Sequence, residues 1–187
     1  MEFVSAVSRI ALVLVFAAAV LGKTRNAESF HAFTYSVETL GRVSAARAPV
    51  LAAGVVLAEA AGALLLAWPA AYGGRLPATI GLLTMIGLLV SFTCAVVRAL
   101  RAGKQVACRC FGTSADPVGP PQLVRNAVLL AVAVTAAPGV WESGHLSWQA
   151  RFAAWLCGAT AALVLVVGDE LVTLLRAAPA APARTST

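Results

Sequence analysis

The chain has 187 residues, of which 60% are hydrophobic and 12% are charged, whereas soluble domains carry about 25% charged residues. This composition excludes an ordinary soluble protein and indicates an integral membrane protein, because the apolar residues gather in long runs. The net charge of +6 does not indicate nucleic-acid binding, because Lys and Arg in a membrane protein mostly reflect topology and contacts with anionic headgroups.

Five apolar runs are each long enough to cross a bilayer, since about 20 helical residues span a hydrocarbon core of about 30 Å. They cover residues 3–21, 49–72, 76–100, 121–140 and 152–175. Backbone polar groups inside lipid must be bonded within their own segment, so each run is predicted to be a helix. We therefore predict an all-α membrane protein, with one domain over residues 1–176 in the lipid bilayer and a disordered Pro/Ala/Thr-rich tail at 177–187.

The first run is expected to be a retained span and not a cleaved signal peptide. Its apolar core is longer than the usual length of about 7–15 residues. The residues that precede this core include Glu2 and a single basic residue, Arg9.

The loop after the first run is predicted to contain an amphipathic helix on the membrane surface. Asn26 can cap its start, Glu28 favours its first turn and Gly41 can end it. Its apolar residues recur at steps of three and four and therefore share one face, at Ala27, Phe30, Phe33, Val37 and Leu40. Such a face suits the boundary between headgroups and acyl chains. The alternative is an ordinary connector on the solvent side.

The second run carries one ionisable residue, Glu59, about 15 Å along the helix from Pro49 and so near the middle of the membrane. A charge at that depth costs at least about 2.5 kcal/mol, so Glu59 is expected to face the bundle interior, either paired or protonated. Two roles stay open: a packing residue hydrogen-bonded to Ser91 or Thr84 of the third run, or a proton carrier beside a redox or ligand site. Small residues spaced by four predict that another helix approaches this run closely, at Gly54, Ala58 and Gly62.

A pair of cysteines stands in the polar loop after the third run, in the stretch "ACRCFG". A disulfide between Cys108 and Cys110 would close a very small ring, and strained disulfides are easily reduced. Arg109 and Lys104 place positive charge nearby, which favours the reactive thiolate. The pair is therefore a poor structural bond and a good candidate for a redox carrier, and Cys94, late in the third run, could serve as a resolving thiol.

A metal site and a purely structural role also stay open for the cysteine pair. A zinc site normally needs four Cys or His ligands, or three and a water, and no His lies near the pair in sequence. A structural role would leave the two thiols without chemistry. Cys157 lies toward the opposite face of the membrane and is expected to be a small buried apolar residue.

The basic residues predict the orientation of the chain. Of the fourteen Lys and Arg residues, all but Arg9, Arg75 and Arg151, that is eleven, fall on the face that holds the first loop, the third loop and the C-terminus. Because positive residues stay inside, the N-terminus is expected outside and the Cys108/Cys110 loop in the cytoplasm.

Three stretches resemble the methylamine-utilisation protein MauE family, which is grouped with DoxX/DoxD-like small membrane proteins. They are "CRCFG" after the third run, with the fourth run opening near Pro121, "GKTRNAESF" after the first run, and "LAEAAGALLL" around Glu59. The resemblance covers residues 5 to 140. It implies a DoxX-like four-helix bundle with an added fifth helix, a redox pair at Cys108 and Cys110, and a buried acid at Glu59. The family is linked to maturation of the disulfide-rich small subunit of methylamine dehydrogenase, with a thioredoxin-like partner.

The sequence thus favours a membrane thiol–disulfide relay that assists the maturation of disulfide-containing exported proteins, with a thioredoxin-like or other thiol protein as partner. Whether it is an enzyme, a thiol–disulfide oxidoreductase, is left open. The competing hypothesis is a non-enzymatic assembly or transport factor that binds a partner protein or a small apolar ligand. No cofactor or metal is expected from the motifs, and a quinone is left open. Quinone-linked vitamin K epoxide reductases are less similar, because their first loop supplies a cysteine pair and this one has none.

Overall fold

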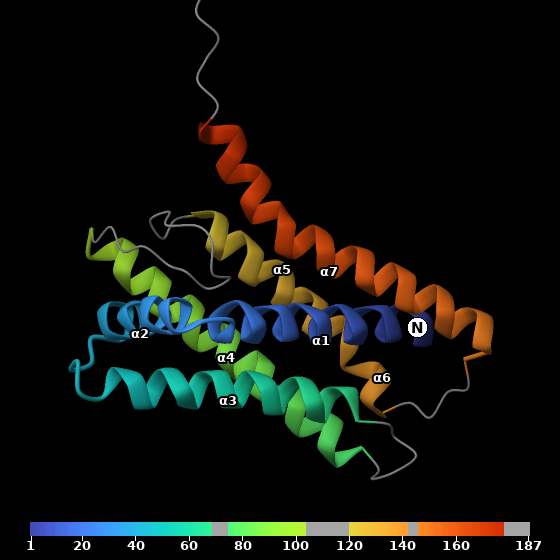
Figure 1. The fold of residues 1–187 in the computed structure, drawn as a ribbon. Coiled ribbons are helices and arrows are strands. Elements are labelled where there is room, and N and C mark those ends of the chain that lie inside the picture. Colours follow the sequence, from blue (N-terminus) through green and yellow to red (C-terminus); the bar gives the residue numbers. More distant parts are fainter. Residues whose placement is uncertain (69–74, 104–119, 142–145, 178–187) are drawn as a thin grey trace, which may run out of the picture.

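The computed structural model describes residues 1–68, 75–103, 120–141 and 146–177, and all secondary structure within these residues is helical (Figure 1). The helices are α1 (Glu2–Thr24), α2 (Ala27–Gly41), α3 (Ala48–Ala67), α4 (Leu76–Arg101), α5 (Pro120–Ala136), α6 (Pro138–Trp141) and α7 (Trp148–Ala177). Five segments are long and apolar enough to cross a membrane: α1, α3, α4, α5 with α6, and α7 from Trp148 to Gly168. The prediction of an all-α protein with five spans is confirmed. The expected tail lies almost wholly outside the described residues.

Local signals account for the ends of α2, the helix predicted in the first loop. Asn26 has an extended backbone, and its side chain accepts a hydrogen bond of 2.7 Å from the backbone N–H of Ser29. At the other end Arg42 adopts the left-handed conformation with φ 54°, and its N–H binds the carbonyl of Glu38. The predicted start and end of this helix are therefore confirmed.

Two helices end earlier than the apolar runs suggest. The second run was expected to continue to residue 72, but α3 ends at Ala67 and Trp68 leaves the helical conformation with ψ 127°. The fourth run was expected to be continuous to residue 140, but α5 ends at Ala136 and the short α6 begins at Pro138. Proline lacks the N–H that an unbroken helix needs, so hydropathy alone does not find this break.

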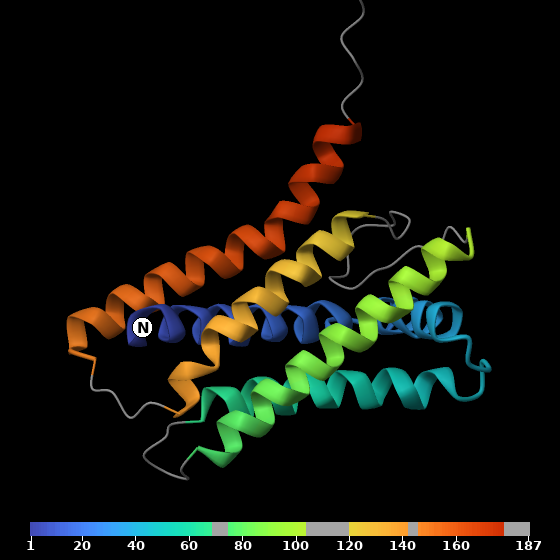
Figure 2. The same cartoon turned by 180° about the vertical axis from the view of Figure 1, so that it is seen from behind.

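The arrangement places α1 at the centre of the bundle. On one side α1 packs against α3 and α5, and α4 packs against both of these, which gives a four-helix core (Figures 1 and 2). On the other side α7 runs along α1 as the added fifth helix. The core is aliphatic at its centre, with Leu12, Val15, Leu66, Met85 and Leu129 all buried.

One basic residue of α1 holds the end of α3. The Arg9 guanidinium donates hydrogen bonds from Nε to the carbonyl of Leu66, at 2.6 Å, and from a terminal nitrogen to the carbonyl of Trp68, at 2.8 Å. The last carbonyls of a helix have no partner within the helix, and a cation there is also favoured by the helix dipole. Arg9 therefore stabilises the C-terminus of α3 and fixes its position against α1.

The predicted close approach of a helix to α3 occurs at one of the expected small residues. A Cβ atom added to Gly81 of α4 would lie 2.6 Å from the backbone nitrogen of Leu66 and 2.7 Å from the carbonyl oxygen of Gly62. Gly54, by contrast, is exposed and has no atom within 4 Å of the corresponding position. The predicted close approach is therefore confirmed at Gly62, where α4 supplies a second glycine, and does not occur at Gly54.

Substitution of Gly81 by Ala is expected to destabilise the protein by about 1–3 kcal/mol, because overpacking against backbone forces α3 and α4 apart. The matched control is Gly87→Ala on the same helix, where an added Cβ meets nothing within 4 Å. Thermal unfolding of the purified proteins in detergent compares the two variants. Equal stability of G81A and G87A would contradict the proposed helix contact.

Candidate functional site

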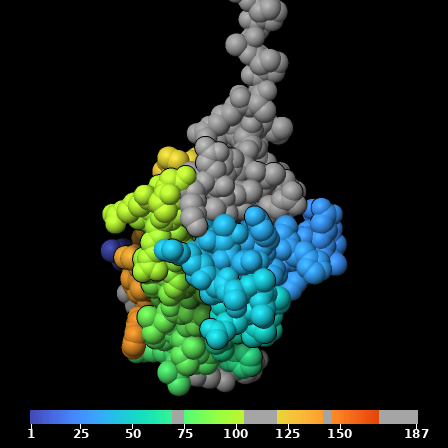
Figure 3. Space-filling view, turned by 90° about the vertical axis from the view of Figure 1, so that its left-hand side faces the viewer, coloured from blue at the N-terminus to red at the C-terminus, as the bar shows by residue number. Residues whose placement is uncertain are grey.

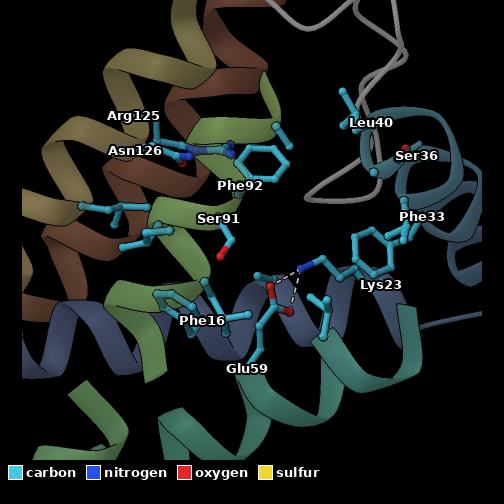
Figure 4. A pocket seen from close by; sticks show the side chains of 18 of the residues that line it. Phe16, Lys23, Phe33, Ser36, Leu40, Glu59, Ser91, Phe92, Arg125 and Asn126 are labelled. Atoms are coloured by element: carbon cyan, nitrogen blue, oxygen red, sulfur yellow. Dashed lines mark hydrogen bonds and ion pairs between the residues drawn. The ribbon is translucent and has the colours of Figure 1, made fainter. Parts of the chain in front are cut away.

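A buried ion pair joins α1 to α3 within the membrane-spanning part of the bundle. Lys23 lies in the last turn of α1, and its Nζ contacts both carboxylate oxygens of Glu59, with a distance of 2.6 Å to Oε2 (Figure 4). The side chains are 4% and 10% exposed. The expectation that Glu59 faces the interior is confirmed. Its expected partners were wrong: Lys23 binds Glu59, whereas the hydroxyl of Thr84 donates to the carbonyl of Ile80.

The pairing follows from the cost of burying charge. Removing one ion from water costs several kcal/mol, and attraction to a close partner offsets that cost only when the geometry is good. The Lys23 ammonium also lies 4.7 Å from the centre of the Phe33 ring on α2, a cation–π contact. The pair therefore helps to hold the surface helix α2 against the bundle, in addition to joining α1 and α3.

A pocket with a volume of about 220 Å³ opens beside this pair, and it receives side chains from α1, α2, α3, α4 and α5. Its walls are mostly apolar and include Phe16, Ala19, Phe33, Val37, Leu40, Val55, Leu88, Leu89, Phe92, Ala95 and Leu129. Its polar lining residues are Lys23, Ser36, Glu59, Ser91, Arg125 and Asn126. The pocket is partly open, and α2 lies beside the C-terminal part of α4 on this face of the molecule (Figure 3).

The polar groups of the pocket stand at two places. Lys23 and Glu59 lie at one side, whereas Arg125 and Asn126 enter from α5 at another, with Ser91 and Phe92 between them (Figure 4). Asn126 is buried and donates a hydrogen bond of 3.1 Å to the hydroxyl of Thr93 on α4. Arg125 is also buried, and its charge is close enough to Lys23 to interact with it.

Sequence reasoning found Glu59 and named Ser91 as a possible neighbour, and it missed Lys23, Arg125 and Asn126 as members of this site. Lys23 and Arg125 were interpreted as topology signals, and Asn126 was not singled out. The signal was nevertheless present, because polar side chains inside apolar spans usually face the bundle interior and pair there. Arg125 and Asn126 lie five and six residues after the first residue of α5, Pro120, and Lys23 precedes the last residue of α1 by one position.

The structure describes two of the four cysteines. Cys94 on α4 and Cys157 on α7 are both exposed and not in a disulfide. The expected burial of Cys157 is therefore wrong, because its face of α7 is not covered by another helix. Cys108 and Cys110 lie outside the described residues, between α4 and α5. No group of His, Cys, Asp and Glu within the described ranges could hold a metal ion.

Comparison with known proteins identifies similar sequences. The family model described as "Methylamine utilisation protein MauE" matches residues 1–139. The methylamine utilization protein MauE of Paracoccus denitrificans is 32% identical over 168 residues, which cover 87% of this chain and 84% of that protein. No solved structure gives a significant match.

Removal of one partner of the ion pair is expected to lower the stability of the protein more than removal of both. Lys23→Met or Glu59→Gln alone leaves an unpaired buried charge and should lower the free energy of unfolding by about 3–5 kcal/mol. The free energy of unfolding of the double variant K23M/E59Q should decrease less than that of either single variant. Unfolding of all three in detergent gives the coupling energy.

The control for this cycle is Glu2→Gln, because Glu2 is an exposed acid on the same helix as Lys23. It should change the free energy of unfolding by no more than about 0.5 kcal/mol. Additive losses in K23M/E59Q would contradict the coupling of the two charges.

Proposed function

The chain belongs to the MauE family of methylamine utilisation proteins, and on that premise we propose that it relays thiol–disulfide exchange in the membrane during the maturation of disulfide-containing exported proteins. One observation carries the proposal. The segment that bears Cys108 and Cys110 connects α4 to α5, and these two helices supply Phe92, Ala95, Arg125 and Asn126 to the pocket beside the buried ion pair.

The proposed reaction is a two-electron exchange between two dithiols. A thiolate of a thioredoxin-like or other thiol partner attacks one sulfur of the Cys108–Cys110 disulfide and forms a mixed disulfide, which releases the other cysteine as a thiolate. The second thiolate of the partner then attacks the mixed disulfide, so the partner leaves oxidised and the cysteine pair is left reduced. The reverse sequence of steps reduces the partner.

Glu59 would accept and donate the protons that the thiol groups exchange in these steps. Each thiolate that is released takes up a proton, and each thiol that attacks gives one up. The Glu59 carboxylate accepts both contacts from Lys23 and is the proton acceptor of the pair. When it takes up a proton, Lys23 remains as the single charge of the pair, and the cost of that charge in the membrane favours release of the proton. Glu59 is therefore proposed to carry this proton.

Cys94 keeps its proposed role as an alternative resolving thiol. Its exposed position on α4 differs from that of Ser91, Phe92 and Ala95, which line the pocket. A resolving step through Cys94 would therefore take place on the outer side of α4. The competing hypothesis of a non-enzymatic factor draws its support from the apolar pocket, and loss or retention of cysteine-dependent activity separates the two.

The relay predicts a trappable complex with its partner. If Cys110 is replaced by Ser, the remaining Cys108 should hold the partner in a mixed disulfide that is visible on a non-reducing gel, and C108S should do the same through Cys110. The double variant C108S/C110S should trap nothing. C157S, which removes an exposed cysteine far along the chain, should behave as the unmodified protein. Trapping in the double variant would contradict the relay through this pair.

The basic residues lead us to propose that Cys108 and Cys110 face the cytoplasm. A membrane-impermeant maleimide should therefore label them only after the membrane of intact cells is permeabilised. If the pair carries a disulfide at rest, labelling should also require a reductant. Labelling in intact cells after reduction would contradict the cytoplasmic orientation but would remain consistent with the proposed relay.

A further inference from the structure

We propose that the pocket beside the Lys23–Glu59 pair binds a lipid-soluble molecule with a single ring that carries oxygen atoms at two edges, the class to which membrane quinones and quinols belong. This inference goes beyond the relay, because it concerns a ligand site formed by described residues of the five surrounding helices and not the cysteine pair.

The size of the pocket limits the head of the ligand. A cavity of about 150 Å³ is large enough for benzene, and this one has a volume of about 220 Å³. The space is therefore large enough for one substituted ring. Phe16, Phe33 and Phe92 lie in the wall, and aromatic side chains favour stacked or edge-on contacts with a ring.

The polar groups determine where the oxygen atoms of the ligand would lie. At one side Lys23 is a donor, and Glu59 can accept further hydrogen bonds, because a carboxylate has about four acceptor positions and Lys23 occupies two of them. At another side Asn126 uses one amide hydrogen on Thr93 and keeps its second hydrogen and its carbonyl oxygen. Ser91 lies between these sides (Figure 4). Both sides can therefore donate to a carbonyl or accept from a hydroxyl.

The surroundings favour a ligand that arrives through the membrane. The helices that form the pocket include four of the candidate spans, and most of its wall is apolar. The pocket is partly open, so an apolar chain attached to the ring can extend out of it. A purely apolar ligand would leave buried polar groups without new partners, which costs free energy relative to a ligand that binds them.

The test measures equilibrium binding of decylubiquinone to the full-length protein in detergent, with decylbenzene as the probe that lacks the oxygen atoms. Decylubiquinone should bind at least about tenfold more tightly, a difference of about 1.4 kcal/mol. Decylbenzene binding of equal affinity would overturn the role of the polar groups.

Three variants localise the binding. Ala95→Phe fills the pocket and should abolish binding of decylubiquinone, whereas Ala131→Phe, at an exposed position of α5 outside the pocket, should leave it unchanged. Should A95F fail to fold, Ser91→Ala is a milder test and should weaken binding about two- to tenfold through loss of one hydrogen bond. Unchanged binding in both A95F and S91A would overturn the site.

Binding should also be the same in C108S/C110S, which cannot perform the proposed relay. This result separates the two proposals, since the relay can fail in the trapping experiment while the ligand still binds. Loss of binding in C108S/C110S would overturn a site formed by the described helices alone.

Discussion

The buried pair of Lys23 and Glu59 is the constraint on which the rest of the bundle depends. Either charge alone is costly within the membrane-spanning part of the protein, which favours an arrangement of α1 and α3 in which the two side chains meet. The same ammonium contacts Phe33 and thereby sets the position of α2. The pocket exists because these three helices are held around the pair while α4 and α5 complete the wall.

Much of the fold could be predicted from hydropathy and local signals. The five spans are set by the length of the apolar runs, and the ends of α2 are set by the capping residue Asn26 and the turn after Gly41. The break between α5 and α6 could not be found from hydropathy, because Pro138 interrupts the hydrogen bonding of the helix without making the run polar. Burial of Cys157 depended on which face of α7 is covered, and a single sequence does not contain that information.

The site was less predictable than the fold for a related reason. Depth in the membrane identifies Glu59 as an unusual residue, but its partner depends on which helices become neighbours. Ser91 and Thr84 were reasonable candidates because α4 follows α3 in the chain, and α4 does pack against α3. The partner comes instead from the end of α1, where the position of Lys23 within an apolar span was a signal for burial that we assigned to topology. Tertiary contact, and not local pattern, decides between these two uses of a lysine.

The two basic residues of α1 have a consequence for the synthesis of the protein. Arg9 holds the C-terminus of α3 and Lys23 holds Glu59 in its interior, so both cations of this helix find their partners on the same later segment. When α1 leaves the ribosome, neither partner has yet been made, and α1 alone would carry uncompensated charge into lipid. Pairing with α3 therefore lowers the cost of placing α1 in lipid, and we expect α1 to be accommodated better in the bilayer when α3 is beside it.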